Sequence, residues 1–270
     1  MAATITARAP AAPGVGPRLR DWRVRRRLSQ LDLANQATVS ARHLSFVETG
    51  RSKPSRELVL HLAEHLNVPL RERNALLLAA GFAPTYPQTP LEATEMAPVR
   101  EALDKILAGH RPFPAIVVDR HWDLVAANEP AVAVMSEGVA PDLLQPPVNA
   151  MRICLHPDGL ASRIVNLPQY AAHLVDRLRR EAEAYGDPRV AELHDELTTY
   201  PGVAGSASPA ETAGELFVPL VIRVGDVVLT FFSLLATFGT ARDITLDELA
   251  VESFFPADEA TAAEVRARWG

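Results

Sequence analysis

Two histidines and a glutamate in the first third of the chain have the spacing of a zinc-binding motif. His61, Glu64 and His65 form the pattern H-x-x-E-H, which is found in one class of metalloproteases. A helix would place both imidazoles on one face, as a zinc ion requires. However, the segment offers no third ligand and no surrounding cleft. We therefore interpret these histidines as exposed helix residues and predict no metal site.

The other reactive side chains do not form a recognisable catalytic set. Cys154 lies among apolar residues, which favours a small buried hydrophobe over the alternative of a redox sensor. His156 and Asp158 could suggest a dyad, but Pro157 and Gly159 indicate a turn. The sequence has no serine nucleophile motif, no phosphate-binding loop and no paired cysteines. We predict a protein that is not an enzyme, with no catalytic residues and no cofactor.

The segment from Ser29 to Gly50 predicts two short helices joined by a tight turn. Ser29 and Ser40 are placed to cap the two helices with their hydroxyl groups. Leu44 and Val47 would turn the second helix inward and leave its other face exposed. The expected apolar face of the first helix comprises Leu31, Leu33, Ala34 and Ala37. Two helices, a turn and an exposed second helix are the layout of a helix-turn-helix.

This segment resembles the Xre/Cro/C1-type repressor helix-turn-helix. The residues that carry the resemblance are Gln30, Leu33, Ala34, Val39, Ser40, Leu44, Ser45, Glu48 and Gly50. The resemblance extends over residues 17–82 and implies an all-α, five-helix, lambda-repressor-like domain whose third helix enters the major groove of double-stranded DNA. A homodimer would then contact the two halves of a palindromic operator, about 34 Å apart.

The same resemblance implies which side chains contact DNA. Base edges are expected to be contacted by Ser40, Ala41, Arg42 and Phe46. Phosphates are expected to be contacted by Gln30, His43, Thr49, Arg51 and Lys53. Arg42 suits a bidentate bond to guanine, with a phosphate contact as its alternative. His43 has solvent as its alternative.

The distribution of charge supports a DNA-binding first part. Residues 1–80 of the 270 hold 13 Arg and Lys against 6 Asp and Glu, whereas residues 81–270 hold 14 against 27. This asymmetry is typical of a DNA-binding head on a body that does not bind DNA. The single cysteine excludes an internal disulfide framework and favours a reducing cytoplasm. The longest apolar stretch, residues 227–238, is too short to span a bilayer. We expect a cytoplasmic protein without a membrane partner.

Composition divides the chain into four parts. Residues 1–15 predict a disordered tail and residues 16–82 the helix-turn-helix domain, with helices beginning near Pro17, after Ser55 and at about Leu70. In the first of these helices, Arg23, Arg25, Arg26 and Arg27 are expected mostly to face solvent, with phosphate contacts by one or two of them as the alternative. Frequent prolines in residues 83–98 predict a linker. Residues 99–270 would form the second domain.

Alternation and helical spacing outline an α+β second domain. Strands are expected at residues 113–119, 122–128, 216–223 and 227–238, and helices from residue 129 and at residues 99–108, 170–185, 189–197 and 244–255. The two adjacent strands that end in Asn128 and precede a helix resemble the opening of a PAS domain. The helical stretch before the last two strands would be an insertion.

Several motifs of this domain resemble the MmyB-type ligand-binding domain. They occupy residues 155–160, 164–166, 231–233, 237–240 and 252–258, and the resemblance runs from about residue 110 to the C-terminus. It implies a PAS-like fold and a small apolar ligand such as a fatty acid or fatty-acyl chain. The candidate lining residues are Ile116, Val118, Val132, Met135, Tyr170, Leu174, Phe231, Leu235 and Phe238. For each, simple core packing is the alternative.

We therefore predict a homodimeric, sequence-specific repressor whose PAS-like domain senses a small apolar ligand. One alternative is a constitutive DNA-binding regulator whose second domain only dimerises or binds a protein partner. An enzyme fused to a DNA-binding head is a third class, but it would need polar groups that converge in a pocket, which the sequence does not provide.

Overall fold

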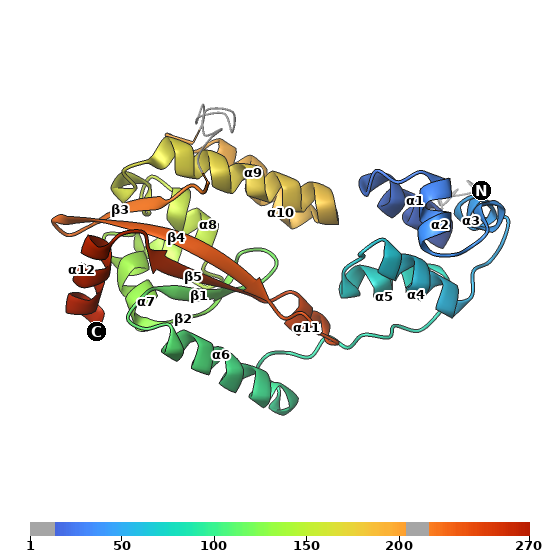
Figure 1. The fold of residues 1–270 in the computed structure, drawn as a ribbon, viewed down its shortest axis with the longest axis horizontal. Helices are drawn as coiled ribbons and strands as arrows, with labels where there is room; N and C mark the ends of the chain where they lie inside the picture. The colour runs from blue at the N-terminus through green and yellow to red at the C-terminus, as the bar shows by residue number, and fades with distance from the viewer. Residues whose placement is uncertain (1–13, 204–215) are drawn as a thin grey trace, which may run out of the picture. The chain divides into compact units, whose positions relative to one another are not determined.

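The computed structural model describes residues 14–203 and 216–270 and divides into two compact units. The first unit runs up to Pro87 and the second begins at Gln88 (Figure 1). Residues 1–13 of the predicted tail lie outside the described residues, whereas Val15 already begins the first helix. Among the described residues, no helix combines the length and the apolar character needed to cross a membrane.

The described part of the first unit consists of five α-helices, as predicted. They are α1 (Val15–Arg25), α2 (Gln30–Gln36), α3 (Ala41–Glu48), α4 (Arg56–His65) and α5 (Leu70–Ala79). The hydroxyls of Ser29, Ser40 and Ser55 cap α2, α3 and α4 by accepting a hydrogen bond from a backbone N–H three residues later. α1 begins two residues before Pro17, so the prediction of its start was slightly late.

The core of the first unit corrects two expectations. Leu33, Ala34 and Ala37 are buried, but Leu31 is 60% exposed. Leu31 and Leu33 differ by two positions, which is about 200° around a helix, so they cannot share one face. Arg23, expected to face solvent with its neighbours, is buried.

The second unit contains one antiparallel sheet of five strands among its described residues. The strands are β1 (Ala115–Val118), β2 (Leu124–Ala127), β3 (Leu220–Val224), β4 (Val227–Thr237) and β5 (Ala250–Pro256). Their order across the sheet is β2-β1-β5-β4-β3. The last strand in the sequence therefore lies at the centre, between β1 and β4, and joins the two hairpins into one PAS-like sheet.

Helices cover both faces of this sheet (Figure 1). They are α6 (Ala97–Gly109), α7 (Glu129–Ser136), α8 (Ala150–Leu155), α9 (Leu167–Tyr185), α10 (Pro188–Thr198), α11 (Ile244–Asp247) and α12 (Glu259–Trp269), with short 3-10 turns at Thr94–Met96, Pro141–Leu144 and Ala161–Arg163. Ile116 and Phe231 face the larger core, shared with α7, α8, α9 and α10. Val117 and Val251 face the smaller core, which α6 covers. The helical insertion predicted between the strands corresponds to α8, α9 and α10.

The end of the chain differs from the prediction. Instead of one helix over residues 244–255, the structure has the short α11, the central strand β5 and then α12. β5 gains its regular structure from hydrogen bonds on both sides, because Glu252 lies opposite Ile116 of β1 and Leu235 of β4. Such long-range pairing leaves little local signal in the sequence.

The proline-rich stretch crosses the boundary between the two units. On each side of the boundary, it forms hydrogen bonds within the unit to which that part of the chain belongs. In the first unit, the side chain of Asn74 accepts hydrogen bonds from the backbone N–H groups of Thr85 and Tyr86 at 2.9 and 3.1 Å, and donates one to the Tyr86 carbonyl. In the second unit, the Thr89 hydroxyl donates to Asp243 at 2.6 Å. Two residues, Pro87 and Gln88, separate Tyr86 from Thr89.

Candidate DNA interface and ligand cavity

The outward face of α3 presents the side chains predicted to contact bases. Arg42 is exposed, whereas Ala41 and Phe46 are half-buried. The Ser40 hydroxyl accepts a hydrogen bond from the His43 backbone N–H at 3.4 Å, which starts the helix. Leu44 and Val47 are buried and fix the opposite face of α3 in the core, as predicted. The helix therefore has a defined outer surface that begins at its capped end.

Two guanidinium groups gather around the Phe46 ring. The Cζ atoms of Arg42 and Arg51 lie 5.4 and 5.9 Å from the ring centroid. Contacts of this kind attract a cation to the face of an aromatic ring. They hold positive charge beside α3, and they also occupy part of the Phe46 ring, which was predicted to contact base edges.

A buried ion pair joins α3 to the two helices before it. The carboxylate of Glu48, with a side chain that is 1% exposed, accepts hydrogen bonds from Arg23 Nε at 2.7 Å and Nη2 at 2.8 Å. The Gln30 amide donates to the same carboxylate at 2.7 Å. Gln30, predicted to contact phosphate, is therefore engaged within the protein. We refer to Arg23, Gln30 and Glu48 as the clamp.

The electrostatics of the clamp favour the charged form of Glu48. Burial on its own would raise the pKa of Glu48, but hydrogen bonds from Arg23 and Gln30 together with the charge of Arg23 outweigh it, and the pKa is lowered. The backbones also approach closely here, because a Cβ atom on Gly16 would lie 2.3 Å from the carbonyl oxygen of Val47. Glycine at position 16 thus allows α1 to reach the end of α3.

The remaining phosphate candidates lie on or after α3. His43, Thr49, Arg51 and Lys53 are all exposed. The Thr49 hydroxyl donates to the Ser45 carbonyl at 2.7 Å, so it also ends the helix. The backbone N–H groups of Arg51 and Ser52 both donate to the Phe46 carbonyl, which folds the basic loop back against α3. Whether these residues contact DNA stays a prediction.

The two histidines of the H-x-x-E-H pattern contact other residues of the first unit and each other. His61 Nε2 lies 2.7 Å from the Ala37 carbonyl oxygen, and the His61 and His65 rings meet edge to face at 4.7 Å. In the described part of the chain, the residues that group closely enough to hold a metal ion are instead Asp119, His121 and Asp123.

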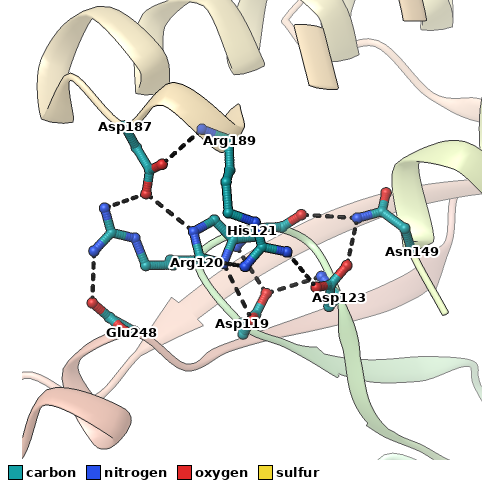
Figure 2. Close-up of polar contacts among 8 residues, drawn as sticks. All are labelled: Asp119, Arg120, His121, Asp123, Asn149, Asp187, Arg189 and Glu248. Carbon is teal, nitrogen blue, oxygen red and sulfur yellow. Dashed lines mark hydrogen bonds and ion pairs between the residues drawn. The ribbon is translucent and has the colours of Figure 1, made fainter. Parts of the chain in front are cut away.

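Those three residues belong to a polar cluster at the turn between β1 and β2. Figure 2 shows this cluster, which consists of Asp119, Arg120, His121, Asp123, Asn149, Asp187, Arg189 and Glu248. Asp119 Oδ1 accepts hydrogen bonds from the backbone N–H groups of His121 and Asp123. Arg120 forms ion pairs with Asp187, the cap of α10, and with Glu248 after α11. We interpret the cluster as structural, because its polar groups join the turn to three other segments.

A cavity of about 70 Å³ lies in the larger core of the second unit, between the sheet and helices α7, α8 and α9. Five of the nine predicted residues line it, namely Ile116, Met135, Tyr170, Leu174 and Phe231. By the usual allowance for a buried water, it would hold roughly five water molecules. Almost all of the lining is apolar, which suits a small apolar ligand.

The other four predicted residues do not line the cavity. Val118 is buried in the core beyond it, and Val132 is 51% exposed because it lies on the outer side of α7. Leu235 is on the inward face of β4 but is 42% exposed, since it lies beyond the covered part of the sheet. Phe238 packs on the opposite face, in the core beneath α6. The spacing of apolar residues did not distinguish covered from uncovered positions.

Three further lining residues, Glu252, Trp122 and Cys154, were not among those predicted from the sequence. Glu252 of β5 is 6% exposed and contributes to the cavity wall. Trp122 also lines it and donates from Nε1 to Glu181 at 2.9 Å. Cys154 lines it too, and burial raises the pKa of its thiol to about 12, which agrees with an unreactive cysteine. A single acid within the apolar run of residues 249–255 was the available signal for Glu252.

Each of the two units matches a known protein family. A helix-turn-helix domain family matches residues 15–76, and the MmyB-like transcription regulator ligand binding domain matches residues 99–267. No curated protein matches the chain. The second match covers more than half of the sequence and contains the whole cavity lining. The chain therefore belongs to the MmyB-like transcription regulator family, with a helix-turn-helix domain ahead of its ligand-binding domain.

Proposed function

We propose that this transcription regulator is a cytoplasmic, homodimeric repressor whose affinity for a palindromic operator changes when a small apolar, fatty-acyl-like ligand enters the second unit. The observation that carries the proposal is the apolar cavity, about 70 Å³ in volume, within a domain of a ligand-binding family. A second unit that served only for dimerisation would need no such space. A ligand can change DNA affinity only to the extent that it binds the DNA-binding state of the protein and the state that does not bind DNA with different affinities.

On the DNA side, we propose that Ser40, Ala41, Arg42 and Phe46 meet base edges. Phosphates would be contacted by His43, Thr49, Arg51 and Lys53, and by Gln30 through the part of its amide that the clamp leaves available. The exposed position of Arg42 near the capped start of α3 supports this assignment. A bidentate contact to guanine discriminates by about 1–3 kcal/mol, or roughly 5- to 150-fold in affinity.

The first test compares binding to the DNA upstream of the protein's own gene with binding to a scrambled sequence, across a salt series. Arg42→Ala should lose the preference for the natural sequence by about 5- to 150-fold. Arg25→Ala is the matched control, because it removes the same charge from an exposed position on α1. Arg25→Ala should keep the wild-type preference for the natural sequence, because it removes a positive charge without changing α3. Equal preference in the wild type and in Arg42→Ala would contradict the role of α3.

The second test addresses the ligand. Native mass spectrometry of the purified protein should show a bound apolar molecule, and removing that molecule should change affinity for the preferred DNA. The runner-up function, a second unit that only dimerises, predicts an empty protein whose DNA affinity is insensitive to added apolar compounds. Sedimentation of the intact protein would show whether the dimer forms.

A further inference from the structure

The second half of β4 extends beyond the strand beside it (Figure 1). β4 pairs with β5 as far as Thr237, but β3 covers its other edge only up to Phe231. Residues 233–237 are all exposed, and the exposed fractions of Leu234 and Leu235 are 58% and 42%. We refer to residues 233–237 as the open edge.

The backbone groups of alternate residues point out of the open edge. In an antiparallel sheet, the N–H and C=O groups of one residue point to the same side, and those of the next residue point to the other side. Thr230 bonds on the β5 side, because its carbonyl accepts from the Ala257 N–H at 2.8 Å. The backbone groups of Ser233, Leu235 and Thr237 therefore point away from β5. Among the described residues they have no hydrogen-bond partner, so they form a template for a further strand.

The outer strands of the sheet are protected against such pairing. On the free side of β3, the Val221 carbonyl accepts from the Val165 N–H at 2.8 Å, and the Asn166 side chain accepts from the Val221 N–H at 3.1 Å. At the opposite end of the sheet, β2 has only four residues, and the Leu124 N–H donates to the Val148 carbonyl at 2.7 Å. Short edge strands and covering loops are common ways to prevent edge-to-edge association. In the described part of the chain, the open edge has neither, which indicates that it has a partner.

A second copy of the chain is the partner that fits this edge. Residues 227–238 contain no charged side chain, so two identical strands can approach each other without repulsion between like charges. Two antiparallel copies of one strand are related by a two-fold axis, so each copy makes the same contacts as the other. Pairing would also cover the exposed side chains of Leu234 and Leu235. A charged peptide, in contrast, would find no opposite charge on this strand.

We infer that the homodimer forms by antiparallel pairing of the open edge with the open edge of a second copy, which joins the two sheets into one. This inference rests on the proposed homodimer and identifies its interface. Only alternate residues direct their backbone groups outward, so the two-fold axis has to pass beside one residue that lies opposite its own counterpart.

The first test measures dimerisation of the full chain by sedimentation across a concentration series. Leu234→Lys should weaken the dimer at least about ten-fold, because it removes an apolar contact and brings two ammonium groups close together. Val228→Lys is the matched control. Val228 is 45% exposed and lies on the same face of β4 as Leu234, but β3 fills the edge beside it. This control variant should dimerise as the wild type does.

The second test locates the two-fold axis by cross-linking. In an antiparallel pair, opposite Cα atoms are about 4.5–5.5 Å apart, which is within the range of a disulfide bond. Among Leu234→Cys, Leu235→Cys and Ala236→Cys, mild oxidation should link one variant efficiently to its own copy, whereas Val228→Cys should not be linked. The natural Cys154 lines the cavity and has a pKa of about 12, so it should not compete.

Each outcome of these tests has a distinct meaning. A Leu234→Lys dimer as tight as that of the wild type, equal weakening by Val228→Lys, or no cross-link at any of the three positions would overturn the inference and leave the proposed homodimer in place. A wild-type chain that stays monomeric, both alone and on its preferred DNA, would overturn both. Both lysine variants replace exposed side chains, so their melting temperatures should stay within a few degrees of the wild type. The Arg42 and ligand experiments report separately on DNA recognition and sensing.

Discussion

Replacing Glu48 with alanine should strongly destabilise the first unit, although Glu48 is not part of the outer face of α3. The side chains of Glu48 and Arg23 are 1% and 10% exposed, so water screens their interaction little. Removing one partner of a buried, hydrogen-bonded ion pair costs about 3–5 kcal/mol, because the other charge stays buried without compensation. In the variant, Arg23 would lose both hydrogen bonds to the Glu48 carboxylate and would keep the one that its Nη1 atom donates to the Leu28 carbonyl at 2.8 Å.

Hydrogen exchange followed by mass spectrometry measures this effect within the intact chain. A loss of about 3–5 kcal/mol corresponds to a roughly 150- to 4,000-fold increase in the opening of α1, α2 and α3. Peptides from β1 and β5 serve as an internal reference, because the clamp lies wholly in the first unit. Glu48→Gln should have a smaller effect, since its amide oxygen still accepts hydrogen bonds.

The double variant Arg23→Leu/Glu48→Leu gives the strictest test. It removes both charges, so exchange should be slower than in Glu48→Ala, where one charge remains buried. The reasoning would be refuted if Glu48→Ala left exchange in α1, α2 and α3 within about three-fold of the wild type, less than 1 kcal/mol by the same conversion.

Three further predictions concern packing and pH. Gly16→Ala should destabilise the first unit by about 1–3 kcal/mol, since the new methyl group would overlap the Val47 carbonyl, and unchanged thermal unfolding would contradict this. Leu33→Ala should cost about 2–5 kcal/mol in urea unfolding, whereas the exposed Leu31→Ala should stay within about 0.5 kcal/mol, and equal costs would refute the assigned faces. The hydrogen bond with Asp119 raises the pKa of His121 in the folded protein. Protonated His121 therefore stabilises the fold, and this stabilisation is fully present below the unfolded-state pKa of histidine, about 6.5. It is lost as the pH rises through the folded-state pKa of His121. The melting temperature of the second unit should therefore fall less between mildly acidic and mildly basic pH in His121→Asn, and an unchanged slope would contradict the role of His121.

Local chemistry explains which features could be predicted from the sequence. Ser29, Ser40 and Ser55 each cap a helix through a bond to a residue three positions away, so their effect is visible in a short window. The hairpin of β3 and β4 was recognisable for the same reason, because Gly225 and Asp226 form its turn.

The features that were missed depend on contacts between distant segments. Arg23 looked like one of several solvated arginines, and its burial depends on Glu48, 25 positions later. The local sequence of β5 predicts a helix, because the strands that hold β5 in the sheet lie elsewhere in the chain. Val132 and Leu235 have the apolar character of lining residues, but which positions the helices cover is settled only by the packed structure.

The central position of β5 also constrains the order in which the protein acquires its structure during synthesis. The β1–β2 and β3–β4 hairpins are both made before residue 250, yet neither contacts the other directly across the sheet. Isolated hairpins are at best marginally stable, so the second unit has to wait for residues 250–256 to leave the ribosome. The first unit is complete about 160 residues earlier, at Pro87. A message truncated before codon 250 would therefore yield a folded helix-turn-helix unit attached to a second unit that lacks the central strand of its sheet and the Glu252 and Phe254 walls of its cavity.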